Sequence, residues 1–145
     1  MATIPASSVR AAKDIRTVFS RLRRRLREVA GLGDLTPSQT SVLSRLERGI
    51  PCSASDLAAL ERVRPQSMAA TLAAIQEHGL IERQPDPADG RRQLISLTEA
   101  GREAIAGSRR QREEWLARAL TDHYTEAERQ TVIEALRLLD RLAEL

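Results

Sequence analysis

The side chains best suited to act on a partner in this sequence are arginines in the middle of the chain. Arg62 and Arg64 stand between two expected helices, and Arg91 and Arg92 stand beside Asp89 in a turn-rich segment. A guanidinium presents five N–H donors in a planar fork that matches the oxygens of phosphate and carboxylate groups. These groups therefore predict the binding of an anion.

Residue combinations for catalysis or metal binding are missing from the sequence. His78 and His123 are the only histidines, and neither has a partner at metal-ligand spacing. The sequence holds no glycine-rich phosphate loop, nucleophile elbow or HExxH motif. We therefore expect no enzyme, no cofactor and no metal site. Cys52, the single cysteine, excludes an internal disulfide and is interpreted as a small core residue, with a thiol sensor as the alternative.

The charge of the chain is small but unevenly placed. Among 145 residues, 23 Lys and Arg oppose 20 Asp and Glu, and Lys13 is the only lysine. Residues 1–30 carry a net charge of +6 and the remainder −3. This asymmetry favours a negatively charged partner, nucleic acid before membrane, although a coding bias toward arginine explains the composition equally well. Whether the cations between Arg16 and Arg27 touch a partner or are simply solvated stays open.

The composition limits the fold class and the location of the protein. Hydrophobic residues make up 41% of the chain and aromatic residues only 2%, so the apolar material is mostly Leu and Ala. These residues form helices readily and strands poorly, which rules out an all-β fold. No stretch approaches the ~20 apolar residues that cross a bilayer, and residues 1–8 lack an apolar signal core. We expect a cytoplasmic protein without a membrane partner.

Three helix starts are marked in the middle of the chain. Thr36-Pro37-Ser38-Gln39 and Ser53-Ala54-Ser55-Asp56 have the form of N-terminal caps, in which a side chain at each end bonds the other's backbone amide. Pro65 is favourable only in a first helical turn and so begins a third helix. That helix is expected to run to about His78, with Gly79 as its left-handed stop. Two helices joined by a turn at Arg62–Arg64 have the outline of a helix-turn-helix.

A hairpin and longer helices complete the pattern. Residues 80–84 and 93–97 are the only two credible strands, and they enclose a polar, turn-rich stretch at 85–92. Behind a helix-turn-helix, such a hairpin is the wing of a winged helix. Apolar residues at steps of three and four predict a long helix over residues 9–30, and two further helices over residues 98–145.

The predicted fold class is mainly α with a small β-wing. Residues 36–97 form a winged helix-turn-helix, and residues 9–30 and 98–145 form long amphipathic helices whose apolar stripes exceed what so small a unit can cover. A second copy of the chain is the simplest cover, so that residues 1–145 make one domain intertwined in a two-fold dimer. The alternative is a monomeric bundle of these helices.

The helix that begins at Pro65 carries the expected base-reading face. Opposite its apolar stripe lie small or polar residues that allow close approach to the major groove. These are Gln66, Ser67, Ala70, Thr71 and Ala74. In the turn, Arg62 and Arg64 would reach phosphate or the groove edge. The alternative is a solvent-facing helix with small residues by chance.

The expected wing tip carries a second candidate contact. Arg91 and Arg92 lie beside Asp89, and a guanidinium inserted into a narrow minor groove is attracted by the enhanced negative potential there. The neighbouring carboxylate is expected to hold the arginine side chain extended. The alternative is an exposed turn whose charges contact nothing.

Taken together, these segments resemble the MarR (multiple antibiotic resistance regulator) family along nearly the whole chain. The resemblance rests on Leu35-Thr36-Pro37-Ser38-Gln39, Arg62-Val63-Arg64-Pro65-Gln66-Ser67-Met68, His78-Gly79-Leu80-Ile81-Glu82-Arg83, Asp86-Pro87-Ala88-Asp89-Gly90-Arg91-Arg92 and Leu97-Thr98-Glu99-Ala100-Gly101-Arg102. It implies a homodimeric winged-helix transcription factor that binds a palindromic operator, often a repressor released by a small ligand. Asp89 and Arg91 fall on the family's wing pair, and Ser67 and Thr71 on its recognition-helix positions.

The sequence departs from the family pattern at two places. Ala69-Ala70-Thr71 stands where many similar sequences have Thr-Arg-Thr, and Gly90 stands where arginine is common. The chain also lacks the N-terminal cysteine of oxidation-sensing members and the clustered ligands of zinc-sensing members. The resulting interpretation is a DNA-binding regulator, a homodimer and ligand-responsive repressor whose effector is unknown. The alternative is a winged-helix module that binds a protein partner without reading DNA.

Overall fold

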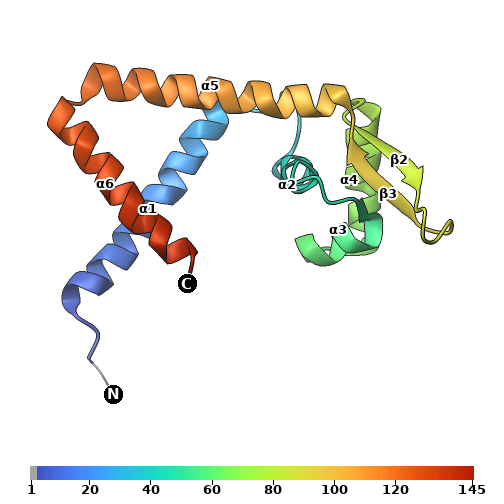
Figure 1. Ribbon diagram of the computed structural model, residues 1–145, viewed down its shortest axis with the longest axis horizontal. Helices are drawn as coiled ribbons and strands as arrows, with labels where there is room; N and C mark the ends of the chain where they lie inside the picture. The colour runs from blue at the N-terminus through green and yellow to red at the C-terminus, as the bar shows by residue number, and fades with distance from the viewer. Residues whose placement is uncertain (1–2) are drawn as a thin grey trace.

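In the computed structural model, which describes residues 3–145, six helices and three short strands follow one another along the chain (Figure 1). The helices are α1 (Ala6–Val29), α2 (Pro37–Leu46), α3 (Ala54–Glu61), α4 (Pro65–Glu77), α5 (Glu99–His123) and α6 (Glu126–Ala143). The strands are β1 (Cys52–Ser53), β2 (Ile81–Pro85) and β3 (Gln93–Leu97). The predicted class, mainly α with a winged helix-turn-helix, is confirmed.

The hydrophobic core lies in the winged half of the molecule. α2, α3 and α4 pack with the sheet around fully buried side chains such as Leu43, Leu57, Leu72, Ile75 and Ile95. The expected apolar stripe of α4 is therefore confirmed. On the other side of the helix the side chains are exposed at Gln66, Ser67 and Ala70 and half-buried at Thr71 and Ala74. One turn of α5 closes this core through Ile105.

The sheet has one strand more than the sequence predicts. β2 and β3 form the expected antiparallel hairpin, with Ile81 opposite Leu97 and Pro85 opposite Gln93. β1 adds only Cys52 and Ser53 to the other edge of β3, giving the order β1-β3-β2. The expectation of only two strands was wrong, because two residues give no recognisable periodicity and form a strand only through their partner in β3.

The helix starts and stops follow the predicted local chemistry. Thr36 Oγ1 accepts the Gln39 amide at 3.3 Å while the Gln39 side chain accepts the Thr36 amide at 3.0 Å. Ser53 and Asp56 form the same reciprocal cap at the start of α3. Gly79 has a φ of 71°, the left-handed conformation expected after α4.

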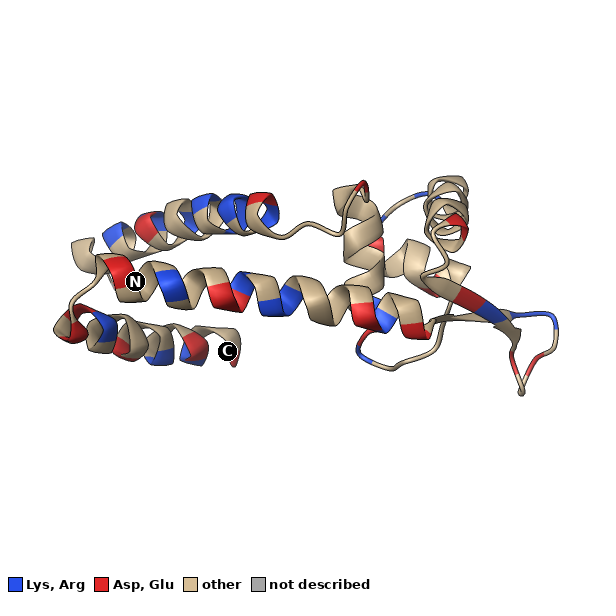
Figure 2. Cartoon of the chain, turned by 90° about the horizontal axis from the view of Figure 1, so that it is seen from above, with Lys and Arg blue, Asp and Glu red and all other residues tan. Residues whose placement is uncertain are grey.

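The terminal helices extend away from the winged half. α1 and α6 both lie to one side of α5 in Figure 1, where they cross, but Figure 2 places them on opposite sides of it. Neither helix buries a single residue in the described part of the chain. The dimer and the bundle of mutually packed terminal helices both stay predictions.

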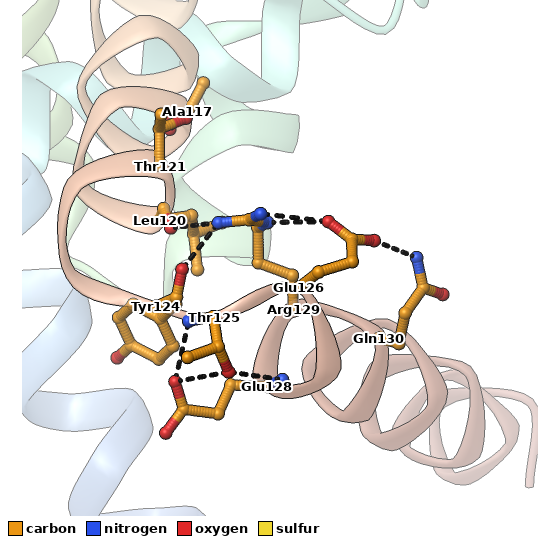
Figure 3. A network of polar contacts seen from close by, with 9 residues as sticks. All are labelled: Ala117, Leu120, Thr121, Tyr124, Thr125, Glu126, Glu128, Arg129 and Gln130. Atoms are coloured by element: carbon orange, nitrogen blue, oxygen red, sulfur yellow. Dashed lines mark hydrogen bonds and ion pairs between the residues drawn. The ribbon is translucent and has the colours of Figure 1, made fainter.

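Arg129 fixes the turn between α5 and α6 (Figure 3). Its guanidinium donates to the carbonyls of Leu120 and Tyr124 at the end of α5, at 3.2 and 2.5 Å, and pairs with Glu126 at 2.9 Å. α5 ends at His123, within the range of residues 98–145 over which two helices were expected. None of the helices described for residues 3–145 has the length and hydropathy needed to span a membrane.

Candidate nucleic-acid interface

The outer face of α4 is exposed and uncharged along its first two turns. Gln66, Ser67 and Ala70 are exposed, and Thr71 is half-buried. The Thr71 hydroxyl donates to the Ser67 carbonyl at 3.0 Å, so its proton is already engaged and its oxygen is left as an acceptor. The face is therefore flat and weakly polar, suited to close contact.

The turn before α4 carries two exposed cations, Arg62 and Arg64. Arg62 ends α3 with φ 55° and ψ 44°, a left-handed conformation that non-glycine residues rarely adopt. This conformation lets the amides of Arg62 and Val63 bond the last carbonyls of α3. Arg64 precedes Pro65 in an extended conformation. Both arginines are exposed, and no acidic group among residues 3–145 pairs with either.

The wing tip is a loop closed by its own hydrogen bonds, and Arg91 is exposed on it. The loop is closed where the Asp86 amide donates to the Arg92 carbonyl at 2.9 Å. Inside it, Asp89 Oδ1 accepts the Arg91 amide at 3.0 Å. The Asp89 carboxylate thus shapes the backbone, whereas the sequence predicted that it would hold the arginine side chain. The Arg91 guanidinium is exposed and has no hydrogen-bond partner within residues 3–145.

Arg92 behaves differently from its neighbour. Its Nη2 atom contacts Asp56 Oδ2 at 2.6 Å and Ser53 Oγ at 3.0 Å, both at the start of α3. The hydrogen bonds from Ser53 and the Arg92 charge lower the pKa of the Asp56 carboxyl. That Arg92 contacts DNA stays a prediction. Ser53 and Asp56 were recognised in the sequence only as a cap, because their contact with a residue 36 or more positions away depends on the folded sheet.

Within residues 3–145 no group of three or more His, Cys, Asp or Glu side chains is placed to hold an ion. Cys52 is buried in β1, as predicted, and burial raises the pKa of its thiol. A protonated, buried thiol is a poor nucleophile, which agrees with a core role.

A groove lies between α1, α2 and the middle of α5. Its volume is about 640 Å³. Apolar side chains such as Phe19 and Leu26 share its lining with three cations, Arg23, Arg27 and Arg112. Arg112 Nε donates to the Ala30 carbonyl at 3.0 Å, which fixes its side chain at the end of α1. The groove therefore joins an apolar wall to a positively charged rim.

Comparison with known proteins gives the same family from sequence and from structure. Residues 33–92 match the model of the MarR family. An HTH-type transcriptional regulator of Mycobacterium bovis is 39% identical over 114 residues, 79% of this chain and 80% of that protein. A regulator of Mycobacterium leprae is 37% identical over the same shares of each chain. The crystal structure of a putative transcriptional regulator from Pseudomonas aeruginosa is 36% identical, with a TM-score of 0.82, covering 98% of this chain and 99% of that one.

Proposed function

Because the chain belongs to the MarR family and is a transcriptional regulator, we propose that it binds a palindromic operator as a homodimer and represses transcription until a small effector releases it. The observation that carries the DNA-binding part is the exposed, acid-free face of α4, with arginines before it and in the wing that pair with no acid among residues 3–145. A solved protein of the same fold, Staphylococcus aureus MepR, is described as bound to an oligodeoxyribonucleotide. At 20% identity that likeness concerns the fold alone.

The α4 face is proposed to read bases in the major groove. Gln66 can make a bidentate bond to adenine, and Ala70 can touch a thymine methyl group. Ser67 and Thr71 supply oxygen acceptors, and Ser67 also has a hydroxyl donor free of any bond among the described residues. Specificity then comes from few and short side chains, because no arginine stands on this face.

The arginines around α4 are proposed to position the protein on the DNA backbone and minor groove. Arg62 and Arg64 are exposed beside the first turn of α4, where phosphates pass a helix seated in the major groove. Arg91 extends from the wing, where an adjacent minor groove would meet it, and Asp89 keeps its loop in shape. These contacts carry little sequence information but set the register of α4.

The exposed apolar residues of the terminal helices support the dimer. Val9 and Val18 on α1 are each 58% exposed, and Ile133 and Leu136 on α6 are 58% and 53% exposed. Large apolar side chains this exposed on two long helices mark an interaction surface, and a second copy offers the same faces by two-fold symmetry. Such a dimer would place two α4 helices ~34 Å apart, the spacing of successive major grooves.

The groove beside α1 is the proposed effector site. Its apolar wall and the guanidinium groups of Arg23, Arg27 and Arg112 fit a small amphipathic anion. α1 belongs to the half of the molecule proposed to form the dimer, and α2 belongs to the winged half. A ligand bound between them would therefore change the orientation of the two halves relative to each other. The DNA is released when this change alters the distance between the two α4 helices, so that they no longer fit successive major grooves.

Sequencing the DNA fragments that the purified protein retains tests the DNA-binding proposal. We expect a two-fold symmetric consensus and an affinity that falls steeply as salt rises, because each neutralised phosphate releases counterions. The competing hypothesis of a module that binds proteins through its wing predicts no enriched DNA sequence. Retention of random fragments without a consensus would contradict the proposed sequence specificity.

A further inference from the structure

Arg92 stands at the base of the wing and not at its tip. It lies immediately before β3, and its carbonyl accepts the Asp86 amide where the loop closes. Its own amide donates to the Asp89 carbonyl at 2.9 Å. The backbone of Arg92 is therefore held on both sides, and its side chain leaves the loop in a defined direction.

That direction leads to the cap of α3. Arg92 Nη2 lies 2.6 Å from Asp56 Oδ2 and 3.0 Å from Ser53 Oγ. Asp56 Oδ2 also accepts the Ser53 amide at 2.9 Å, and Ser53 Oγ accepts the Asp56 amide at 3.1 Å. The guanidinium thus joins a closed set of hydrogen bonds whose other members are already fixed by the start of a helix.

The contact links the two parts that must meet DNA together. Ser53 belongs to β1, pairs with Leu94 of β3 and caps α3, the first helix of the helix-turn-helix. Arg92 belongs to the wing loop. A side chain that ties the loop to the cap therefore fixes the angle between the wing and the helix-turn-helix.

We propose that Arg92 is a positioning residue that serves DNA binding through Asp56, by holding the wing at the angle at which Arg91 reaches the minor groove. The proposal rests on the proposed DNA binding and replaces the expectation that Arg92 contacts DNA directly. Arg91 keeps its guanidinium free for DNA, whereas that of Arg92 has its partner inside the protein.

Asp56→Asn distinguishes a positioning role of Arg92 from a purely electrostatic effect of the lost charge. The two explanations predict opposite changes in DNA affinity. Asn keeps an oxygen to accept the Ser53 amide but removes the charge that holds Arg92. Simple electrostatics predicts tighter binding, because a negative charge near DNA is lost. The positioning role predicts weaker binding to the enriched duplex, by about twofold to fivefold for a half-exposed ion pair. Asp56→Glu, which keeps the charge and the cap, should bind like the wild type.

Glu82→Gln is the matched control. Glu82 is an exposed acid on β2 of the same hairpin, and no ion pair within residues 3–145 uses it. Its removal should leave binding unchanged or make it slightly tighter. Binding of Asp56→Asn that is as tight as or tighter than the wild type would overturn the proposal.

Arg92→Gln and the double variant decide between a positioning role and a phosphate contact. If Arg92 acts through Asp56, Arg92→Gln weakens binding as much as Asp56→Asn, and the double variant adds nothing. The slope of log affinity against log salt then stays as in the wild type. A slope that falls by about 0.9 in Arg92→Gln, with additive losses, would identify a direct phosphate contact and refute the proposal.

A measurement on the protein alone separates failure of this proposal from failure of DNA binding. Hydrogen exchange at the Asp86 and Arg92 amides reports closure of the wing loop. Both amides should exchange faster in Arg92→Gln and in Asp56→Asn, and at the wild-type rate in Glu82→Gln. Unchanged exchange in the first two variants would overturn the positioning role even if the protein bound no DNA.

Discussion

Gly101, in the first turn of α5, is a position at which one added methyl group should lower the stability of the fold strongly. An added Cβ would lie 2.2 Å from the Leu80 carbonyl oxygen and 3.1 Å from the Leu80 carbonyl carbon. Both atoms belong to the backbone between α4 and β2, so neither can swing aside as a flexible side chain would. To reach even 3.0 Å, the start of α5 must move by about 0.8 Å, as the distance from 2.2 Å requires.

The movement would disturb hydrogen bonds as well as packing. The Leu80 carbonyl accepts the Thr98 amide at 3.0 Å, and Thr98 Oγ1 donates to the Gly79 carbonyl at 2.6 Å. Overpacking of a tight site costs ~1–3 kcal/mol, and the partial weakening of these two hydrogen bonds together adds ~1 kcal/mol. Against this, alanine gains ~1 kcal/mol of helix propensity over glycine. We expect Gly101→Ala to lower the free energy of unfolding by about 1–3 kcal/mol.

Gly107→Ala, further along the same helix, is the control variant. It adds the helix propensity of alanine without the backbone clash expected at position 101. Its Cβ would meet only Arg110 Nη2, at 3.9 Å, the end of a flexible side chain. This variant should therefore be more stable than the wild type, by up to ~1 kcal/mol.

Thermal unfolding of the three proteins, followed by circular dichroism at one protein concentration, gives the comparison. One concentration is needed because the apparent stability of a dimer depends on it. Gly101→Ala should melt about 3–10 °C lower than the wild type, and Gly107→Ala at the same temperature or higher. Equal or increased melting temperatures for both variants would refute the argument that Leu80 sets the position of α5.

Two further variants and two properties of Cys52 test other parts of the structure. Arg91→Ala should weaken binding to the enriched duplex about tenfold, because an unpaired guanidinium is lost from the wing, and an unchanged gel-shift affinity would contradict this. Leu136→Asp should shift the protein from dimer to monomer in light scattering, because it charges a 53% exposed apolar site on α6, whereas a persistent dimer would place the interface elsewhere. Cys52, whose thiol pKa is raised by burial, should react slowly with a disulfide reagent in the folded protein and fast in denaturant. Its contribution to stability should decline as the pH rises above the unfolded thiol pKa of about 8.5, since only the unfolded thiol then ionises.

The helix boundaries were predictable because their causes are local. The caps of α2 and α3, Pro65 and Gly79 each act within a few residues of themselves, so the sequence contains all the information. The start of α1 was predicted three residues too late, at residue 9 instead of Ala6, because no side-chain cap marks it. β1 was missed because its strand character comes from pairing with β3, about 40 residues away.

The candidate interface was predictable in its residue types and less so in their partners. The exposed face of α4 followed from helical periodicity, and the position of Arg91 from the hairpin. That Thr71 turns its hydroxyl back to Ser67, and that Asp89 bonds an amide, depends on side-chain rotamers that no spacing rule specifies. The Arg92 contact with Asp56 depends on the tertiary arrangement of β1 and β3.

A coding bias toward arginine was the alternative explanation for the arginine-rich composition. The positions of acidic residues around the arginines help to decide between that bias and a role in binding a polyanion. Such a bias can set the number of arginines, but it does not decide which of them lack a carboxylate neighbour. On α5 and α6 several arginines pair with acids one turn away, as in Arg102 with Glu99, Arg118 with Glu114 and Arg137 with Glu134, whereas Arg110 and Arg141 pair with no acid among residues 3–145. Around α4, Arg62, Arg64 and Arg91 lack such a partner within residues 3–145. Glu77, at the end of α4, is that helix's only acid. Unpaired cations beside an acid-free helix face are what a polyanion requires, so the placement of the arginines favours DNA where their number does not.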